Sequence, residues 1–182
     1  MQKWIILGVV IITILLGVIL FLNFSIETEY IPETEIEDVE LRKTIVSIYF
    51  QHRDTKEVKK ETRLIDSKNL LQNPYKELIN MLIEGPKSEE LESIIPKDTR
   101  VLSTLLQSNC LVIDFSKEFL NVEADDIQKY NIISAIVNTL TELTEVHSVK
   151  ILIEGIEEEG FLDIGLDFRN EFTRNNIKRE TE

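Results

Sequence analysis

The N-terminal stretch Trp4–Phe24 constrains this chain more than any other segment. It holds no charged residue and only two polar ones, Thr13 and Asn23. As an α-helix it would extend about 31 Å, which matches a bilayer hydrocarbon core of roughly 30 Å. We therefore predict one transmembrane helix here, so that the remaining residues must fold on one side of a membrane.

A cleaved signal peptide is the alternative explanation of this stretch. The apolar run is longer than the roughly 7 to 15 residues of a signal-peptide core, and residues 23–27 offer no small-x-small cleavage site. No cysteine follows closely enough to accept a lipid, since the only one is Cys110. Lys3 precedes the run and five glutamates follow it within residues 27–37, which places the N-terminus in the cytoplasm by the positive-inside rule. These features favour an uncleaved, single-pass anchor in the cell membrane, with residues 25–182 outside the cytoplasm.

The part of the chain beyond the anchor is strongly acidic. The sequence has 20 basic and 33 acidic residues, and the anchor segment removes only Lys3, so residues 25–182 carry a net charge of −14. Such a surface repels phosphate backbones and anionic head groups, which argues against nucleic acid as a partner. A surface kept soluble by its charge is the simplest explanation, and a basic partner surface is the alternative.

Composition divides the chain into four parts. Seven acids precede the first base of the linker, Arg42, and together with Pro32 they favour an extended, solvated segment. The domain that follows is long enough to bury its own core, and Cys110 is expected to be a small buried side chain in it. The end of the chain is expected to fray from Arg169. The predicted parts are an anchor at 1–24, an acidic linker at 25–42, a globular domain at 43–166 and a polar tail at 167–182.

Periodicity and turn residues predict the elements of the domain. Asn73 followed by Pro74 indicates the start of a helix, and Gly85 followed by Pro86 indicates its end. The short connection 107–109 between two strand-like runs indicates a β-hairpin. We predict strands at 44–51, 58–65, 99–106, 110–115 and 149–153, helices at 74–84 and 124–143, a helical turn at 88–93 and an edge segment at 161–164.

The order of these elements, β-β-α-β-β-α-β, predicts the fold class. Because the strands are clustered with two main helices between them, an α+β two-layer sandwich of a mixed β-sheet fits better than a doubly wound parallel sheet. We expect the helices to cover one face of the sheet.

The residues offer no recognisable catalytic or metal-binding motif. His52 and His147 are the only histidines and lie at the ends of predicted elements, where a lone histidine is usually solvated. Asp114 with Glu118 could form a glycosidase pair, but among so many acids some pair always lies close. The run 157–159 lacks the spaced acids and turn glycine of a calcium loop. We therefore predict no enzymatic activity, no cofactor and no metal.

Three polar residues are candidates for interaction with a partner. Arg63 lies within a predicted strand, where a charged side chain usually points to solvent. Asn138 and Thr139 lie inside a long helix with an apolar stripe, so they could cap a partner's strand or bind a ligand. The more common explanation for such a pair is exposure to solvent or a local hydrogen bond.

Seven short motifs follow one another along the domain. They are Ile48-Tyr49-Phe50, Arg63, Leu82-Ile83-Glu84-Gly85-Pro86, Leu91 with Ile95-Pro96-Lys97-Asp98-Thr99, Ile113-Asp114-Phe115-Ser116-Lys117-Glu118-Phe119, Ile136-Val137-Asn138-Thr139-Leu140-Thr141-Glu142-Leu143, and the closing set Val146, Val149, Ile153-Glu154-Gly155 and Gly160-Phe161-Leu162-Asp163. Each is common alone, but in this order they resemble the GerMN domain family of sporulation and spore germination proteins over residues 44–165.

The resemblance implies a non-enzymatic domain that faces the cell envelope of endospore-forming and related bacteria. The family is similar to the ring-building domains of secretion-like channels, and it provides no catalytic residues to transfer. One member resembles a lipoprotein with two such domains, whereas this chain has a plain apolar span and one domain.

These observations lead to one functional hypothesis and an alternative. We expect a membrane-anchored domain that mediates protein-protein interaction or assembly in the envelope, in sporulation or spore germination, with envelope or sporulation-complex proteins or further copies of itself as partners. The alternative is a module that binds or hydrolyses cell-wall peptidoglycan through its acidic groups.

Overall fold

The computed structural model describes residues 14–16, 18, 42–122 and 125–177. Within this described part, no helix is both long and apolar enough to cross a membrane. The predicted anchor Trp4–Phe24 falls outside the described residues except at positions 14–16 and 18, and the predicted linker 25–42 falls outside them except at Arg42. Both therefore stay predictions.

The first sheet is built around a long antiparallel hairpin. Strand β1 (Lys43–His52) pairs with β2 (Val58–Asp66) along its whole length, and with the short β3 (Leu91–Glu92) at its end. Alternate residues of β1 are buried, as the sequence pattern predicts for a strand with one face in the core. These buried residues are Val46, Ile48 and Phe50.

The helical turn predicted at 88–93 is wrong in its second half. A turn does form at 88–91, where the Leu91 amide donates to the Ser88 carbonyl at 3.3 Å. Leu91 then pairs with His52 as part of β3, because the end of β1 has a free edge there. Tertiary pairing thus replaces the expected helical conformation.

The second sheet has the predicted hairpin at its edge. Strands β4 (Val101–Gln107) and β5 (Cys110–Phe115) are joined by Ser108 and Asn109, whose φ angles are 49° and 68°. Positive φ at both central residues is the type I′ geometry that matches the twist of a tight hairpin. Strand β6 (Ser148–Ile153) completes the sheet by pairing in parallel with β5.

Helix α2 has the predicted bounds, whereas α3 is shorter than the predicted 124–143 at both ends. The side chain of Asn73 accepts a hydrogen bond from the Lys76 amide at the start of α2 (Pro74–Glu84). Asp125 forms a capping box with Gln128 at the start of α3 (Asp126–Leu140). Single-turn 3₁₀ helices occur at η1 (Ser67–Leu70), η2 (Lys117–Leu120) and η3 (Leu162–Ile164).

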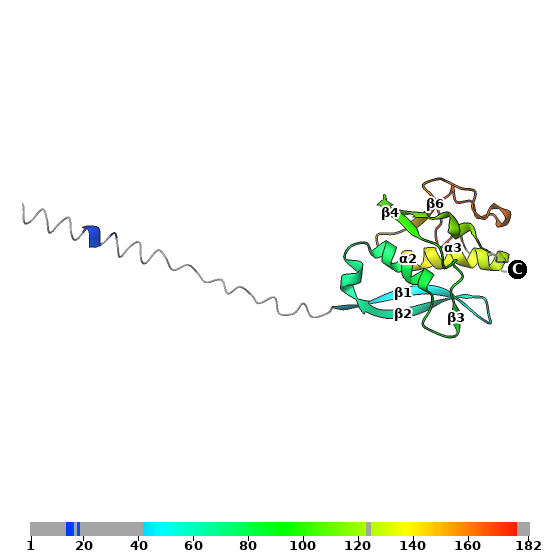
Figure 1. The fold of residues 1–182 in the computed structure, drawn as a ribbon, viewed down its shortest axis with the longest axis horizontal. Helices are drawn as coiled ribbons and strands as arrows, with labels where there is room; N and C mark the ends of the chain where they lie inside the picture. The colour runs from blue at the N-terminus through cyan, green and yellow to red at the C-terminus, as the bar shows by residue number, and fades with distance from the viewer. Residues whose placement is uncertain (1–13, 17, 19–41, 123–124, 178–182) are drawn as a thin grey trace, which may run out of the picture. The chain divides into compact units, whose positions relative to one another are not determined.

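The arrangement in layers differs from the predicted sandwich of one mixed sheet. The strands of the described part form two separate three-stranded sheets, β2-β1-β3 and β4-β5-β6, and Figure 1 shows α2 and α3 between them. One physical cause of the separation into two sheets lies on β1. The amide of Tyr49, which points away from β2, donates to the Thr139 hydroxyl of α3 at 3.0 Å, so a helix lies where a further strand would pair.

The C-terminal segment is packed rather than frayed, so the expectation of a loose tail from Arg169 is wrong for residues 169–177. Phe172 exchanges two backbone hydrogen bonds with Val149 of β6, at 2.9 and 2.7 Å. Of the predicted edge segment 161–164, residues Leu162–Ile164 form η3 instead, and Phe161 makes an isolated β-bridge with Leu166. The segment 161–177 contributes five buried side chains to the core, namely Phe161, Leu166, Phe168, Phe172 and Ile177.

Candidate functional site

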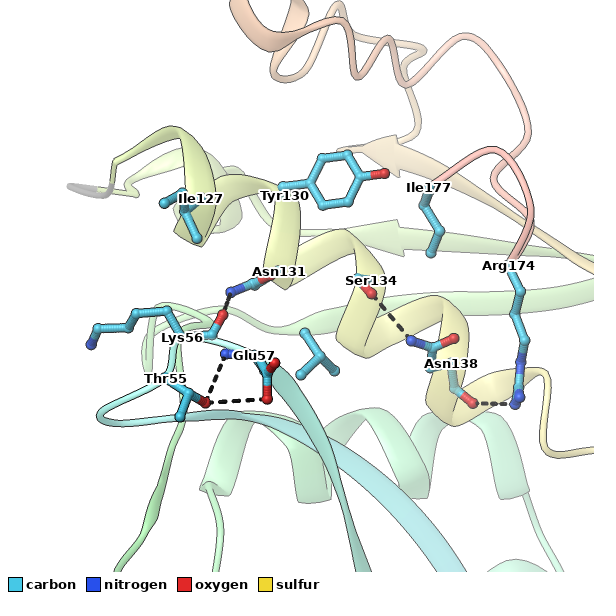
Figure 2. Close-up of a pocket in the computed structure, with 11 residues that line it drawn as sticks. Thr55, Lys56, Glu57, Ile127, Tyr130, Asn131, Ser134, Asn138, Arg174 and Ile177 are labelled. Atoms are coloured by element: carbon cyan, nitrogen blue, oxygen red, sulfur yellow. Dashed lines mark hydrogen bonds between the residues drawn. The ribbon is translucent and has the colours of Figure 1, made fainter. Parts of the chain in front are cut away.

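One hollow of the described domain is a groove along α3, which we call the α3 groove. It has a volume of about 660 Å³ and lies between the tip of the β1–β2 hairpin, one face of α3 and the C-terminal segment (Figure 2). This volume is in the range of sites that bind small ligands or short peptide segments. The groove is lined by Thr55, Lys56, Glu57, Val58, Ile127, Tyr130, Asn131, Ser134, Asn138, Arg174 and Ile177.

The floor of the groove is a row of polar side chains on α3. Asn131, Ser134 and Asn138 are three and four residues apart, so they lie on one face of the helix. Figure 2 shows them in line along α3, where the Asn138 side-chain amide donates to the Ser134 hydroxyl at 3.1 Å. From Ile132 to Leu140, the residues of α3 outside this row are buried, and all of them except Thr139 are apolar. The row is therefore the part of this stretch that presents polar groups to the groove.

At one end of the groove, Asn131 holds the hairpin against α3. Its side-chain amide donates to the Gln51 side chain at 2.6 Å and to the Lys56 carbonyl at 2.8 Å. Gln51 is completely buried and donates in turn to Glu92, which also pairs with the Lys56 ammonium at 2.8 Å. The hydrogen bond from Lys56 is the main reason why the pKa of Glu92 is lowered. Because these bonds are connected, this end of the groove is fixed in shape.

At the other end, Arg174 fastens the C-terminal segment to the end of α3. Its guanidinium donates to the Asn138 carbonyl at 2.9 Å, to Glu142 at 2.7 Å and to the Thr141 hydroxyl at 2.6 Å. A cation there also favours the negative end of the helix dipole. The hydrogen bond from Arg174 is the main cause that lowers the pKa of Glu142.

Tyr49 completes this cluster. Its hydroxyl donates to Glu142 at 2.9 Å, and the Arg174 guanidinium lies 5.8 Å from the centre of its ring. Burial, followed by the hydrogen bond to Glu142, raises the pKa of the Tyr49 hydroxyl. The hydroxyl therefore stays protonated at physiological pH and acts as a donor.

Of the three predicted interaction residues, only Asn138 lines the groove. Thr139 is fully buried and accepts from the backbone of β1, so it caps a strand of its own chain rather than a partner's. Its hydrogen bond is also not local, since it joins residues 90 positions apart.

Arg63 is buried, with 6% of its surface exposed, so the expectation that it faces solvent is wrong. It donates to Glu61 at 2.6 Å and to the Gly85 carbonyl at 2.6 Å, and it lies 5.3 Å from the centre of the Phe50 ring. Glu61 also accepts from the Lys87 and Ser88 amides, both at 2.9 Å. Arg63 and Glu61 thus bind β2 to the loop that begins at Gly85.

The carboxylates considered for hydrolysis have structural contacts instead. Asp114 accepts from the Gly155 amide at 2.8 Å, and Glu118 lies 3.7 Å from the Arg100 guanidinium. A hydrogen bond from Ser116 is the main cause that lowers the pKa of Glu118, whereas the general acid of a glycosidase needs a raised pKa. Among the residues that the structure describes, no group of three or more His, Cys, Asp or Glu side chains is placed to hold a metal ion.

Sequence reasoning missed most of the α3 groove. The spacing of Asn131, Ser134 and Asn138 was a usable signal, because residues three, four and seven apart share a helix face. No comparable signal marks Arg174, whose role depends on how the C-terminal segment packs.

Comparisons with known proteins agree with the fold. A family profile described as Germane, sporulation and spore germination, matches residues 47–159. The spore germination protein GerM of Bacillus subtilis (strain 168) is 33% identical over 87 residues, which are 45% of this chain and 23% of GerM. This chain thus corresponds to less than a quarter of that relative.

Solved structures with the same fold extend the comparison. The first GerMN domain of the sporulation protein GerM from Bacillus subtilis superposes with a TM-score of 0.61 and 22% identity, covering 72% of this chain and 98% of that domain. The tandem GerMN domains of the same protein give a TM-score of 0.58 and 21% identity, over 72% of this chain and 46% of theirs. A candidate lipoprotein from Clostridium perfringens gives 0.52 and 24%, over 74% and 89%. At these identities the structures establish the fold alone.

Proposed function

Because the chain belongs to the Germane family of sporulation and spore germination proteins, we propose that its globular domain mediates protein-protein contact in the cell envelope, without catalysis, in sporulation or spore germination. The family predicted from the order of the motifs is confirmed. The match over residues 47–159 carries the proposal, since it spans most of the folded domain.

The chemistry of the α3 groove supports contact rather than catalysis. Its floor consists of two amides and one hydroxyl, and its two cations, Lys56 and Arg174, are held in ion pairs. A serine nucleophile needs an adjacent base. In the described part of the chain, the Ser134 hydroxyl contacts the Asn138 amide and no imidazole or carboxylate.

The predicted anchor Trp4–Phe24 supports a place at the membrane. With the N-terminus in the cytoplasm, the domain would act on the outer side of that membrane. Its partners are then envelope or sporulation-complex proteins, or other copies of this chain. Relatives described as a sporulation protein and a candidate lipoprotein are consistent with such a place.

Crosslinking and purification of the tagged full-length protein, from cells passing through sporulation, tests this proposal. We expect co-purification of sporulation or germination proteins, and a tagged chain that ends at Arg42 should not recover them. Recovery of wall-synthesising or wall-cleaving enzymes alone, or release of peptidoglycan by the purified protein, would refute the proposal.

A further inference from the structure

We infer that the free edge of β4 pairs with β4 of a second copy of this chain, so that two three-stranded sheets join into one. This inference rests on the proposed function, because it names the surface and the partner for one of the contacts proposed there. Three observations support it, namely the state of the sheet edges, the lack of charge on β4 and the self-complementary order of its side chains.

The four sheet edges of the described domain differ in how they are protected. Strand β2 carries five charged residues among its nine, and β3 is only two residues long. The edge of β6 is covered, because Phe172 and Ile156 form backbone hydrogen bonds with it. Charges, short strands and covering segments are the usual means that keep an edge strand from pairing with another chain. Strand β4 has none of these three, and its bulge lies at the far end from the turn, between Val101 and Ser103.

The backbone of β4 offers hydrogen-bonding groups to a further strand. Gln107 and Cys110 flank the two-residue turn as a pair, and hydrogen-bonded pairs alternate along an antiparallel ladder. The backbone groups of Thr104 and Leu106 therefore face the open edge. In the described part of the chain, no backbone–backbone hydrogen bond outside the β4–β5 ladder involves residues 101–107.

The lack of charge on β4 favours a second copy as the occupant. Among the described strands, β4 is the one without a charged residue, and residues 101–113 are uncharged in a chain of which 29% is charged. Two molecules with a net charge of −13 repel each other, and this strip is where they can approach closely. A charged strand would have to bury its charges against Leu102 and Leu105, which are 45% and 53% exposed. An uncharged strand such as β4 itself avoids that cost.

The order of side chains on β4 is self-complementary about Leu105. In an antiparallel pair with a two-fold axis at this residue, Leu105 faces its own counterpart and Ser103 faces Gln107. All three residues lie on the exposed face of β4, so apolar meets apolar and polar meets polar. Thr104 and Leu106 then exchange backbone hydrogen bonds with Leu106 and Thr104 of the second copy. Such an interface uses the same surface on both copies, as two-fold symmetry requires.

Cysteine crosslinking of the full-length protein in membranes tests the inference. Cys110→Ser removes the native thiol, and Leu105→Cys then places one thiol on β4. In a non-hydrogen-bonded antiparallel pair the Cα atoms lie about 4.5 Å apart, a separation that a disulfide can span. We expect mild oxidation to convert most of the Leu105→Cys chain into a disulfide-linked dimer.

Leu162→Cys in the same background is the matched control. Leu162 is 45% exposed and lies on η3, outside both sheets. We expect at least about tenfold less dimer from this position, because only random encounters in the membrane would form it.

A charge on β4 provides a second, independent measurement. Leu105→Lys should raise the dissociation constant of the dimer at least about tenfold, since an edge lysine opposes strand pairing, whereas Leu162→Lys should leave it unchanged. Light scattering on the full-length protein in detergent micelles measures this constant, and circular dichroism melting checks that each variant folds. The N-terminal segment is identical in these variants, so association through it cannot produce a difference between them.

Equal dimer fractions from positions 105 and 162, no dimer from position 105, or equal effects of the two lysine substitutions would overturn the inference. A disulfide from position 105 to a different protein would also overturn it, in favour of a foreign strand on the same edge. None of these outcomes affects the co-purification test of the proposed function. Recovery of sporulation proteins without a β4 dimer would assign the contact to another surface of the domain.

Discussion

Thr139 shows how one side chain decides the arrangement around it. The hydroxyl accepts from the Tyr49 amide, which has no strand partner on that side, and both groups lie where α3 meets β1. A buried amide without a partner costs about 1–3 kcal/mol. Loss of this 3.0 Å hydrogen bond should therefore destabilise the fold by about that amount. Sequence reasoning marked Thr139 as unusual for the right reason, a polar group on an apolar helix, but could not name its partner.

Replacement of Thr139 by valine should therefore destabilise the domain. The side chain keeps its shape but loses the acceptor, and we expect the free energy of unfolding to fall by about 1–3 kcal/mol. Hydrogen exchange measured by NMR should show faster exchange of the Tyr49 amide in Thr139→Val. Thr139→Ser keeps the hydroxyl and should retain most of the protection; equal protection in Thr139→Val would contradict this account.

The buried ion pair of Arg63 and Glu61 makes the free energy of unfolding depend on pH. Burial would raise the pKa of Glu61, but the Ser88 amide and the Arg63 guanidinium outweigh it, so the pKa is lowered overall. Since the unfolded chain binds this proton more readily, ionised Glu61 stabilises the fold above the ordinary glutamate pKa of about 4.3. This contribution is lost as the pH falls through the lower pKa of the folded state.

Urea unfolding between pH 7 and pH 3 measures this contribution. Glu61→Gln should lower the stability at pH 7, because it leaves Arg63 buried without its anionic partner, at a cost of about 3–5 kcal/mol. The difference from the wild-type protein should narrow as the pH falls. A difference that stays constant down to pH 3 would show that the ionisation of Glu61 is irrelevant.

At the scale of elements, the C-terminal segment is the clearest case of packing that the sequence pattern does not reveal. Phe168 contacts Phe119, Phe161 and Phe172, with ring centres 6.1, 5.3 and 6.1 Å away. Beyond Arg169 the apolar residues are Phe172 and Ile177, five positions apart among polar and charged ones, which is why this part was predicted to fray. By contrast, Asn73, Pro74 and Gly85 define α2 by local rules, and its bounds agree with the prediction.

Substitution of Gly160 tests how tightly this aromatic cluster is packed. A Cβ atom there would overlap the Phe168 ring, and its φ of 63° also disfavours other residues. Gly160→Ala should therefore lower the free energy of unfolding by about 2–4 kcal/mol, combining overpacking with backbone strain. Gly165→Ala is the matched control, because its φ is 81° but nothing lies within 4 Å. It should cost only about 1–2 kcal/mol in the same urea titration, and equal losses would contradict the role of the cluster.

At the scale of the whole molecule, the order of the main elements was predictable apart from β3, and the division into two sheets was not. The order follows from periodicity and turn residues near each element, whereas the layers depend on contacts between distant residues, such as Tyr49 with Thr139. The groove depends on such contacts as well. The spacing of Asn131, Ser134 and Asn138 on α3 predicts its polar row. Its walls form only because the hairpin tip and Arg174 pack beside that row, which the sequence pattern does not reveal.

The most direct test of the central claim, that this domain works by protein contact and uses the free edge of β4, is position-specific photocrosslinking in living cells that enter sporulation. A photoreactive phenylalanine analogue replaces Leu105 on β4 in one full-length variant and Leu162 on η3 in another. We predict a covalent adduct between two copies of this chain from position 105 that appears during sporulation and is absent from position 162. Adducts from position 162 alone, or equally from both positions, would contradict the claim.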